Sequence, residues 1–415
     1  MEFLHCLELA QAERLVDEHL KQGCVGEEEV GLLAAVGRVS SRIVRAADDL
    51  PGYARSTVDG FAIRSEDSFG ASESAAALFT LVGEVAMGVP VRQALKPGQA
   101  MSIPTGGMLP EGADAVMMLE YTEQPDANTL LGQKMVAPFE NVVRRGEEIA
   151  AGTVLVEAGG RLSDKQIGLF AACGCSRLWV KRRLKVALLS TGDELVDIHE
   201  TPRDGQVRDV NSYSLAALLL RWGCEVQHCG IVRDSFEQFL QQLNQATQEC
   251  QLVIISGGSS VGARDFTVPA IQALDRPGLL MHGLAIKPGK PTIFGLAGSV
   301  PVFGLPGHPV AAWIVCEILV GRAIERMGGM AADRRIKKVP AVLGRNLASL
   351  PGRDDFVPVR LVEQATGYIA EPIFGKSGMI GLLAKADGIL HVPAATSGLY
   401  QGEAVWVRLL GGEGV

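Results

Sequence analysis

Apolar positions follow different periods in different regions of the chain. Residues 7–22 place apolar side chains at helical spacing, and residues 28–36 predict a second, shorter helix. Ser163–Gln166 has the Ser and Gln of a capping box, which predicts the start of another helix. Between these helices, residues 77–144 hold short apolar runs separated by Pro–Gly turns. This order predicts an all-β module inserted between two parts of a helical linker domain.

From residue 185 onward the pattern alternates between strands and helices. Apolar runs at 186–190, 226–232 and 252–255 predict buried strands, each followed by a helical stretch. Repeated strand–helix units form a mostly parallel sheet covered by helices on both faces. Residues 335–415 show no helical pattern. Their short apolar runs between glycine and proline turns predict a small C-terminal β-barrel or sandwich. The predicted fold class is therefore multidomain α/β with additional β domains.

The composition narrows the class of protein. A chain of 415 residues predicts roughly two to four domains, and 49 glycines indicate many tight turns or close approaches of the backbone to a ligand. The net charge of −8 argues against nucleic acid as a partner. The eight cysteines form no Cys-x-x-Cys pair, and no apolar run reaches the ~18 residues of a membrane span. We therefore expect a cytoplasmic protein with reduced thiols and no membrane partner.

The strand at 252–255 ends in a loop of small residues, Ser256-Gly257-Gly258-Ser259-Ser260-Val261-Gly262. A strand, a glycine loop and a helix in this order present free backbone N–H groups to an anion. In an open α/β sheet, ligands bind at the carboxyl ends of the strands. Four carboxylates follow such ends and should converge there: Asp193, Glu194, Asp234 and Asp265. Any one of them could instead be a helix cap or a surface acid. Together, beside a phosphate group, they suit Mg²⁺.

Two further loops of this region carry groups suited to anions. Lys287 and Lys290 lie on a loop stiffened by proline and glycine, and lysine binds phosphate as a point charge. His308 follows a Gly-Leu-Pro-Gly turn at the start of a helix, where it is either a ligand contact or a structural residue. The β region adds three turns that, taken singly, could each be solvated rather than functional: STVDGFA around Asp59, IPTGG around Thr105 and RRGEE from Arg144.

Together these motifs resemble the molybdopterin molybdenumtransferase family, the MoeA proteins, which includes the gephyrin E domain. The resemblance runs from Asp59 to the C-terminus and depends on the order and number of the motifs, since no single one is specific. The matching motifs are STVDGFAIR, PTGGMLPEGADAV, RRGEEI, ALLSTGDEL, VRDVNSYSL, GIVRDS, SGGSSVGARDF, LAIKPGKP, GLPGHPVAAW, GRDDFVPV and GKSGMIGLLAKADGILHVP.

The resemblance implies a chain of four domains. They are a linker domain of residues 1–50 plus 145–180, an inserted β domain of residues 51–144, a three-layer α/β molybdopterin-binding domain of residues 181–330 and a C-terminal β-barrel of residues 331–415. Similar proteins are homodimers. Their active site lies between the α/β domain of one subunit and the inserted β domain of the other.

The implied reaction inserts molybdate into adenylylated molybdopterin and gives molybdenum cofactor and AMP, with Mg²⁺ assisting. The resemblance implies catalytic roles for Asp59, Thr105, Glu194 and Asp265, and a metal near Asp234, Asp265 and Glu194. It implies substrate binding by a larger set: Arg144, Glu148, Ser256, Gly257, Gly258, Gly262, Lys287, Lys290, Pro306, Pro309, Arg353 and Ser377. The adenylylating enzyme and apo-molybdoenzymes are the other implied partners.

Several residues depart from the family's pattern. His308 stands where asparagine is usual and Glu148 where aspartate is usual, and Val58, Ser259 and Ala311 also differ. His308 and Glu148 matter most, because both would touch the implied site. An altered rate, an altered metal preference and a less active paralogue therefore stay open.

Two other functions also stay open. The α/β domain resembles the domain that adenylylates molybdopterin, although that activity needs only the one domain. A non-catalytic carrier or scaffold that binds molybdopterin is the other alternative. AMP release on addition of molybdate supports insertion, pyrophosphate release from ATP supports adenylylation, and binding without AMP release supports a carrier. Tungstate stays open as the natural oxyanion, because it nearly matches molybdate in size and charge.

Overall fold

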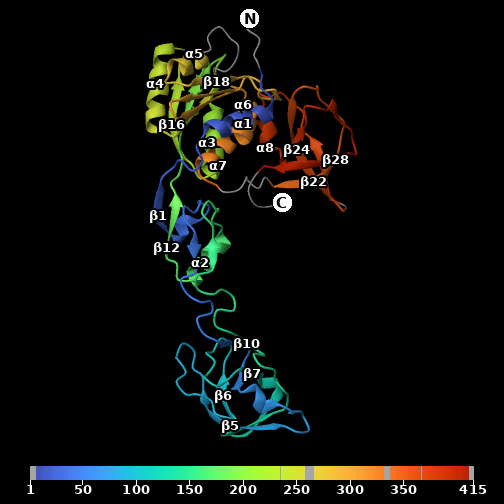
Figure 1. Ribbon diagram of the computed structural model, residues 1–415. Helices are drawn as coiled ribbons and strands as arrows, with labels where there is room; N and C mark the ends of the chain where they lie inside the picture. Colours follow the sequence, from blue (N-terminus) through green and yellow to red (C-terminus); the bar gives the residue numbers. More distant parts are fainter. Residues whose placement is uncertain (1–5, 234, 258–265, 331–336, 366, 411–415) are drawn as a thin grey trace. The chain divides into compact units, whose positions relative to one another are not determined.

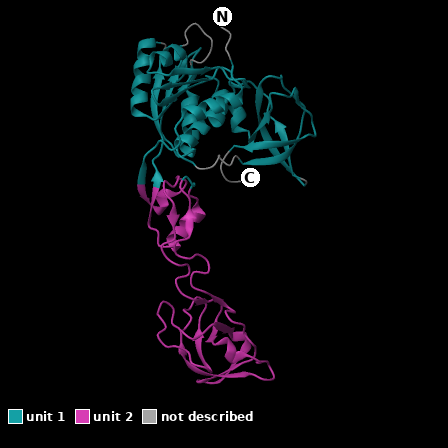
Figure 2. Ribbon diagram, viewed as in Figure 1, with its two compact units in different colours: residues 1–28, 159–161, 180–415 teal, residues 29–158, 162–179 magenta. Residues whose placement is uncertain are grey.

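The computed structural model describes residues 6–233, 235–257, 266–330, 337–365 and 367–410. The chain forms two compact units (Figure 2). Unit 1 comprises residues 1–28, 159–161 and 180–415, and unit 2 comprises residues 29–158 and 162–179. Each unit contains hydrophobic cores of its own.

Unit 1 is built around a six-stranded sheet (Figure 1). Its strands lie in the order β16 (Glu225–Val232), β13 (Lys185–Thr191), β17 (Leu252–Ser256), β21 (Val300–Leu305), β20 (Ile293–Ala297) and β18 (Gly278–His282). The first four are parallel, whereas β20 and β18 are antiparallel to their neighbours. The mostly parallel sheet predicted from the sequence is confirmed.

Helices cover both faces of this sheet because its central strands are apolar on both sides. Neighbouring residues of β13 point in opposite directions, as strand geometry requires, and Leu188 and Leu189 lie in different cores. The first core contains residues of α3 (Val210–Arg221), α6 (Pro309–Val315) and α7 (Gly321–Met327), and the second contains residues of α4 (Phe236–Glu249) and α5 (Thr267–Ala273). The result is the predicted three-layer arrangement.

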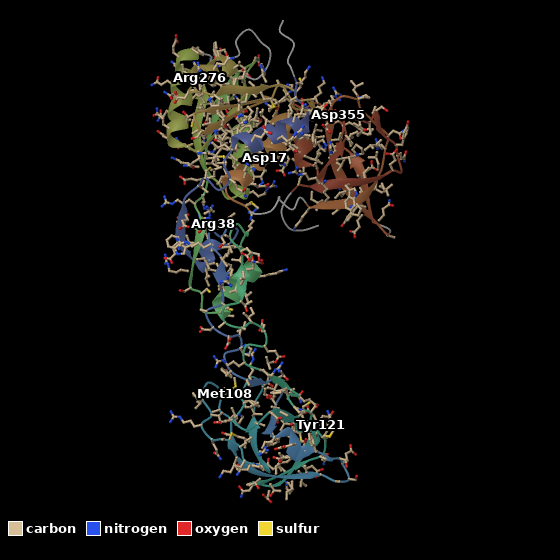
Figure 3. All side chains as sticks on the ribbon, viewed as in Figure 1. Asp17, Arg38, Met108, Tyr121, Arg276 and Asp355 are labelled. Atoms are coloured by element: carbon tan, nitrogen blue, oxygen red, sulfur yellow. The ribbon has the colours of Figure 1, made fainter. Side chains whose placement is uncertain are left out.

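The N-terminal helix α1 (Leu9–His19) belongs to the first of these cores. Ala12 and Val16 are buried in it, and Nε of Arg322 on α7 donates to Oδ1 of Asp17 at 3.0 Å (Figure 3). The sequence grouped this helix with residues 145–180, but its apolar side packs in the α/β core. An amphipathic pattern predicts a helix without showing which core covers it. The four predicted domain boundaries are not tested and stay a prediction.

The C-terminal part of unit 1 is a closed β-barrel of five strands. Their order is β24 (Asp354–Gln364), β25 (Gly367–Pro372), β22 (Lys338–Leu343), β28 (Ala404–Leu409) and β26 (Gly388–Val392), and β26 pairs with β24 to close the ring. Of the two architectures predicted for this part, the barrel is confirmed. A short strand from the α/β part, β19 (Ile286–Lys287), pairs in parallel with β24.

A buried carboxylate joins the barrel to the α/β part. Glu317 lies in a π-helical segment, Cys316–Val320, and is 3% exposed. Its Oε1 accepts a hydrogen bond from Nη2 of Arg408 on β28 at 2.7 Å, and its Oε2 accepts one from Nη2 of Arg221 on α3 at 3.2 Å. A buried charge is tolerated only with such partners, so Glu317 ties three elements together.

Unit 2 contains a second six-stranded sheet (Figure 1). Its strands lie in the order β7 (Ala115–Met118), β4 (Gly60–Ile63), β6 (Gln99–Ile103), β5 (Ala77–Glu84), β9 (Thr129–Gly132) and β8 (Thr122–Asp126). Phe61 and Ala62 of β4 lie in different cores, one on each face of the sheet. The predicted β module is therefore a sheet with two apolar faces.

Two local predictions in the linker region had different outcomes. The capping box before α2 (Asp164–Ala172) is confirmed, because Ser163 and Gln166 bond to each other's backbone N–H groups. The helix predicted at 28–36 is wrong: the chain forms β1 (Glu27–Gly31) and one turn of 3₁₀ helix. β1 pairs with β12 (Arg177–Lys181), and this distant pairing overrides the local pattern.

Short elements complete the described residues: β2 (Val44–Arg45), β3 (Arg55–Ser56), β10 (Val142–Val143), β11 (Val154–Val156), β14 (Leu195–Val196), β15 (Val207–Arg208), β23 (Leu347–Ala348), β27 (Gly398–Leu399) and α8 (Gly381–Ala384). None of the helices in the described residues is both long and apolar enough to span a membrane.

Candidate functional site

The carboxyl ends of four parallel strands meet at one edge of the unit 1 sheet. Ser190 on β13 pairs with Ser256 on β17, which in turn pairs with Leu305 on β21. Thr191 pairs with Val232 on β16. The loops after these strands therefore begin level with one another, which is the position at which α/β sheets bind their ligands.

Gly257 allows two of these loops to approach each other. Its φ is +95°, a conformation that residues with side chains rarely adopt, and a Cβ there would collide with the carbonyl oxygen of Thr191. Its N–H donates to the carbonyl oxygen of Leu305 at 3.2 Å. The predicted site residues Gly258, Gly262, Asp234 and Asp265 lie outside the described residues.

Asn211 at the start of α3 links two of the loops. Its Nδ2 donates to Oγ of Ser256 at 2.8 Å and to the carbonyl oxygen of Gly307 at 2.9 Å. Asn211 is 6% exposed, so these bonds fix its side chain inside the edge. Sequence reasoning missed this residue, although it lies in the motif VRDVNSYSL, where a polar side chain begins a buried helix. Ser256, one of the predicted site residues, is therefore held by a group that was not predicted.

Glu194 is the one predicted metal ligand within the described residues. It is exposed in the loop after β13, and its carboxylate folds back on Gly192, where a Cβ would lie 2.7 Å from Oε2. Among the residues described, no three His, Cys, Asp or Glu side chains are grouped so that they could hold a metal ion. The Mg²⁺ site stays a prediction, because Asp234 and Asp265 lie outside that part of the chain.

A cavity of about 980 Å³ lies within unit 1, lined by both the α/β part and the barrel. Four cationic side chains line it: Lys287, Lys290, Arg353 and Lys376. Pro306, His308 and Ser377 line it as well. Five residues predicted separately as substrate contacts are therefore brought together: Lys287, Lys290, Pro306, Arg353 and Ser377. Pro309 is the first residue of α6, next to His308.

Backbone pairing between β19 and β24 assembles the cationic wall. Ile286 pairs with Asp354 and Lys287 with Asp355, so the lysine loop lies beside the start of the barrel. Nε of Arg353 donates to Oδ1 of the buried Asp355 at 2.9 Å, which holds the guanidinium at the wall. Asp355 is labelled in Figure 3. Lys376 was not predicted, although it precedes Ser377 in the motif GKSG.

A loop of the barrel part is fixed to the first turn of α6. Nδ1 of His308 and Oγ of Ser377 are 2.8 Å apart, and the N–H of Val310 donates to the carbonyl oxygen of Ser377 at 3.0 Å. His308, for which the sequence left a ligand contact and a structural role open, lines the cavity and bonds to another residue that lines it.

In unit 2, the predicted residues Asp59 and Thr105 bond to each other. Oδ1 of Asp59 accepts from the N–H of Thr105 at 2.7 Å and from its Oγ1 at 3.0 Å. These bonds lower the pKa of Asp59, with the Thr105 amide the larger cause and its hydroxyl the smaller. Gly60 is required beside Asp59, since a Cβ there would collide with the carbonyl oxygen of Met117.

Arg144 is held by two neighbours in the loop after β10. Its N–H and Nε donate to Oε2 of Glu147 at 2.8 and 3.3 Å, and its guanidinium carbon lies 5.1 Å from the ring centroid of Phe139. The acidic partner of Arg144 in the structure is thus Glu147. The predicted residue Glu148 is exposed, and its N–H donates to the carbonyl oxygen of Leu50 at 3.1 Å.

Comparison with known proteins covers nearly the whole chain. Residues 7–174 match the model of the MoeA N-terminal region (domain I and II), residues 187–326 a probable molybdopterin binding domain, and residues 340–410 the MoeA C-terminal region (domain IV). A putative molybdopterin biosynthesis protein of Methanocaldococcus jannaschii is 34% identical over 97% of this chain and 98% of its own length. The chain belongs to the MoeA family.

Other MoeA relatives match over similar lengths. A molybdopterin molybdenumtransferase of Staphylococcus epidermidis is 30% identical over 95% of this chain and 93% of its own length. The crystal structure of a molybdopterin biosynthesis MoeA protein from Pyrococcus horikosii superposes with a TM-score of 0.84 at 34% identity, covering 98% of this chain and 100% of that one. The predicted family and multidomain α/β fold are therefore confirmed.

The cavity gives this MoeA chain a clear chemical capacity. Four cations outweigh the one buried carboxylate in its wall, and a serine hydroxyl can add a hydrogen bond. Such a site favours a small oxyanion or the phosphate of a larger ligand. In unit 2, the acid Asp59 and the cation Arg144 lie on exposed turns, where they can meet a ligand from outside.

Proposed function

We propose that this MoeA-family chain is a molybdopterin molybdenumtransferase, which inserts molybdate into adenylylated molybdopterin and releases AMP. The cavity of unit 1, with its four cationic side chains, is the observation that carries the proposal. The Staphylococcus relative bears this activity as its name, and the match to a probable molybdopterin binding domain supports molybdopterin as the substrate.

Molybdate is a tetrahedral dianion, so its site has to supply positive charge and hydrogen-bond donors. Lys287, Lys290, Arg353 and Lys376 supply the charge. Strand pairing places Lys287 beside Asp355, and Asp355 holds the Arg353 guanidinium. Positive charge placed beside the reacting group stabilises developing negative charge. Release of AMP requires cleavage of the bond between the pterin phosphate and the adenylyl phosphorus. When a water oxygen bonds to that phosphorus and the pterin phosphate leaves, the product is AMP. If a molybdate oxygen bonds to it first, water then has to displace the molybdate to give AMP.

We propose Mg²⁺ as the metal of the reaction, held by Glu194, Asp234 and Asp265. Carboxylate oxygens are the donors that Mg²⁺ prefers, and Glu194 follows a strand end at the ligand-binding edge. When bound, Mg²⁺ would neutralise charge on the pyrophosphate. Ser256, the amide of Gly257, and Gly258 and Gly262 of the same loop would bind the phosphates.

Asp59, Thr105, Arg144 and Glu148 would act on the ligand from a second copy of the chain. We propose a homodimer because the resemblance to MoeA proteins implies an active site shared between two copies of the chain. The hydrogen bonds from Thr105 keep Asp59 ionised, so it can accept a hydrogen bond or orient a donor of the substrate. The cytoplasmic location and the partner enzymes stay predictions.

The deciding experiment combines the purified chain, adenylylated molybdopterin, Mg²⁺ and molybdate. AMP release that depends on molybdate, together with activation of an apo-molybdoenzyme, is the expected result. Pyrophosphate release from ATP would instead identify an adenylyltransferase, and tight binding of the pterin without AMP release would identify a carrier. A parallel reaction with tungstate shows which oxyanion the chain prefers.

A further inference from the structure

His308 and Ser377 meet at the wall of the cavity, and each comes from a different part of unit 1. His308 precedes α6 in the α/β part, and Ser377 lies in the loop after β25 of the barrel. Their bond joins Nδ1 to Oγ at 2.8 Å, and the N–H of Val310 fixes the backbone of Ser377. The bond joins the two side chains, and its chemistry depends on the location of one hydrogen atom.

That hydrogen atom decides what Ser377 can do for an anion. A serine hydroxyl has a single hydrogen to donate. When Nδ1 of His308 is bare, it accepts this hydrogen, and Oγ offers the cavity only lone pairs. When Nδ1 carries a hydrogen, it donates to Oγ, and the hydroxyl hydrogen is free to point at a ligand. The imidazolium form always carries a hydrogen on Nδ1.

We propose that His308 is a positioning residue that makes the Ser377 hydroxyl a hydrogen-bond donor to the oxyanion in this cavity. The inference rests on the proposed function, because it deepens the role of the same cavity. An anion draws the pair into the state with hydrogen on Nδ1, and protonation of the imidazole enforces that state. Binding of a dianion therefore tightens as the imidazole becomes protonated.

Other charged groups also line the cavity. They are Lys287, Lys290, Lys376, Arg353 and Asp355, from the β19 loop, the loop after β25 and the segment that leads into β24. The His308→Asn variant described below tests whether any of them contributes to the pH dependence. The thiol of Cys6 also lines the cavity, so the measurements use a Cys6→Ser background.

The test is a double-mutant cycle on the binding of molybdate alone, measured by calorimetry from about pH 6 to pH 8. Sulfate, which stays a dianion throughout, serves as a second probe. Ser377→Ala should weaken binding roughly tenfold at about pH 6, the loss of one hydrogen bond to a charged group. His308→Ala should weaken it by about fivefold, and it should add less than about twofold in the Ser377→Ala background.

Two further variants separate this role from a structural one. His308→Asn retains a side-chain donor that does not titrate, so its binding should be tight and independent of pH. His19→Ala removes an exposed histidine of α1 whose Nδ1 bonds to the carbonyl oxygen of Leu15, and it should behave as wild type. If the effects of His308→Ala and Ser377→Ala multiply, or if His308→Asn keeps the pH dependence, the inference is overturned.

Failure of this inference can be told apart from failure of the proposed function. The binding cycle uses no pterin, whereas the function is judged by AMP release. Normal AMP release with independent effects of the two residues overturns the role of His308 alone. If the chain never releases AMP, the proposed function is overturned. The binding cycle then still shows whether His308 makes Ser377 a donor to an oxyanion.

Discussion

The two units present their candidate residues in different ways. In unit 1, cationic side chains from three loops surround a cavity. The Arg353 side chain is 31% exposed and forms an ion pair with the buried Asp355. In unit 2, Asp59 and Arg144 lie on exposed turns with partners in their own unit, and the Arg144 side chain is 58% exposed. Unit 1 can therefore hold an anion by itself, whereas the residues of unit 2 have to meet a ligand that is bound elsewhere.

The strongest test of this contrast removes charge from the cavity. Lys287→Ala combined with Lys290→Ala should lower molybdate affinity and the rate of AMP release together, by about 1,000-fold in kcat/KM, because two charge-assisted contacts are lost. Calorimetry and the AMP assay measure the two effects. Lys385→Ala, a lysine at the end of α8, is the control and should leave both unchanged. Unaltered affinity in the double variant would refute the anion site.

The next largest effect concerns stability of unit 1. Glu317→Ala leaves Arg221 and Arg408 without their buried partner and should cost about 3 kcal/mol in the free energy of unfolding. Urea titration followed by circular dichroism measures this loss. The half-exposed Glu371, which pairs with the exposed Arg345, provides the control, and Glu371→Ala should cost less than about 1 kcal/mol. Equal losses in both variants would show that burial of the pair is unimportant.

Asp59→Asn tests the other side of the contrast. It keeps the shape of the side chain and removes its charge, so AMP release should fall roughly tenfold to a hundredfold. Molybdate affinity should not change, since Asp59 belongs to unit 2 and is exposed. The melting temperature should fall only slightly, by loss of the charge that the Thr105 bonds stabilise. A loss of molybdate affinity in this variant would show that unit 1 does not bind the anion by itself.

The smallest expected effect is on the titration of Asp59. Thr105→Val removes the hydroxyl that bonds to Asp59 but keeps the amide, so the pKa of Asp59 should rise toward its ordinary value without reaching it. Because folding lowers this pKa, the bonds stabilise the fold above the unfolded-state pKa, and the contribution disappears as pH falls through the folded-state pKa. In Thr105→Val, this stabilising contribution should disappear at a higher pH than in the wild type.

Carboxyl-carbon NMR titration measures this shift directly. Asp126 is the internal reference, because its pKa is lowered chiefly by the Asn128 amide and does not involve Thr105. An unchanged titration of Asp59 in Thr105→Val would show that the hydroxyl bond is not maintained in solution.

Local patterns in the sequence predicted most elements, because their causes are local. The capping box at Ser163 formed, and each run of alternating strand and helix became a βα unit. Ser235 and Gln238 have the same spacing and also predict a capping box, but the Ser235 side chain makes no cap bond, although α4 begins at the next residue. Such a pattern permits a cap but does not set the backbone angle that makes one.

The cavity could be predicted only in part. The resemblance assigned Lys287, Lys290 and Ser377 to one site. The residues alone do not place them together, because the β19–β24 pairing and the bond of Val310 to Ser377 join segments that are distant in the sequence. Asn211 was missed for a related reason: its role depends on two loops that approach each other only in the folded chain. The proposed roles of Asp234 and Asp265 stay predictions from the sequence.

Three of the connections that the described residues make between the barrel and the α/β part have a kinetic consequence. The β19–β24 pairing, the bond of Val310 to Ser377 and the Glu317 cluster are separate anchors. Three separate anchors leave little freedom for a hinge, so the walls of the cavity are already in position before a ligand arrives. Oxyanion capture should then be a single bimolecular step, with an observed rate that rises linearly with concentration and does not saturate.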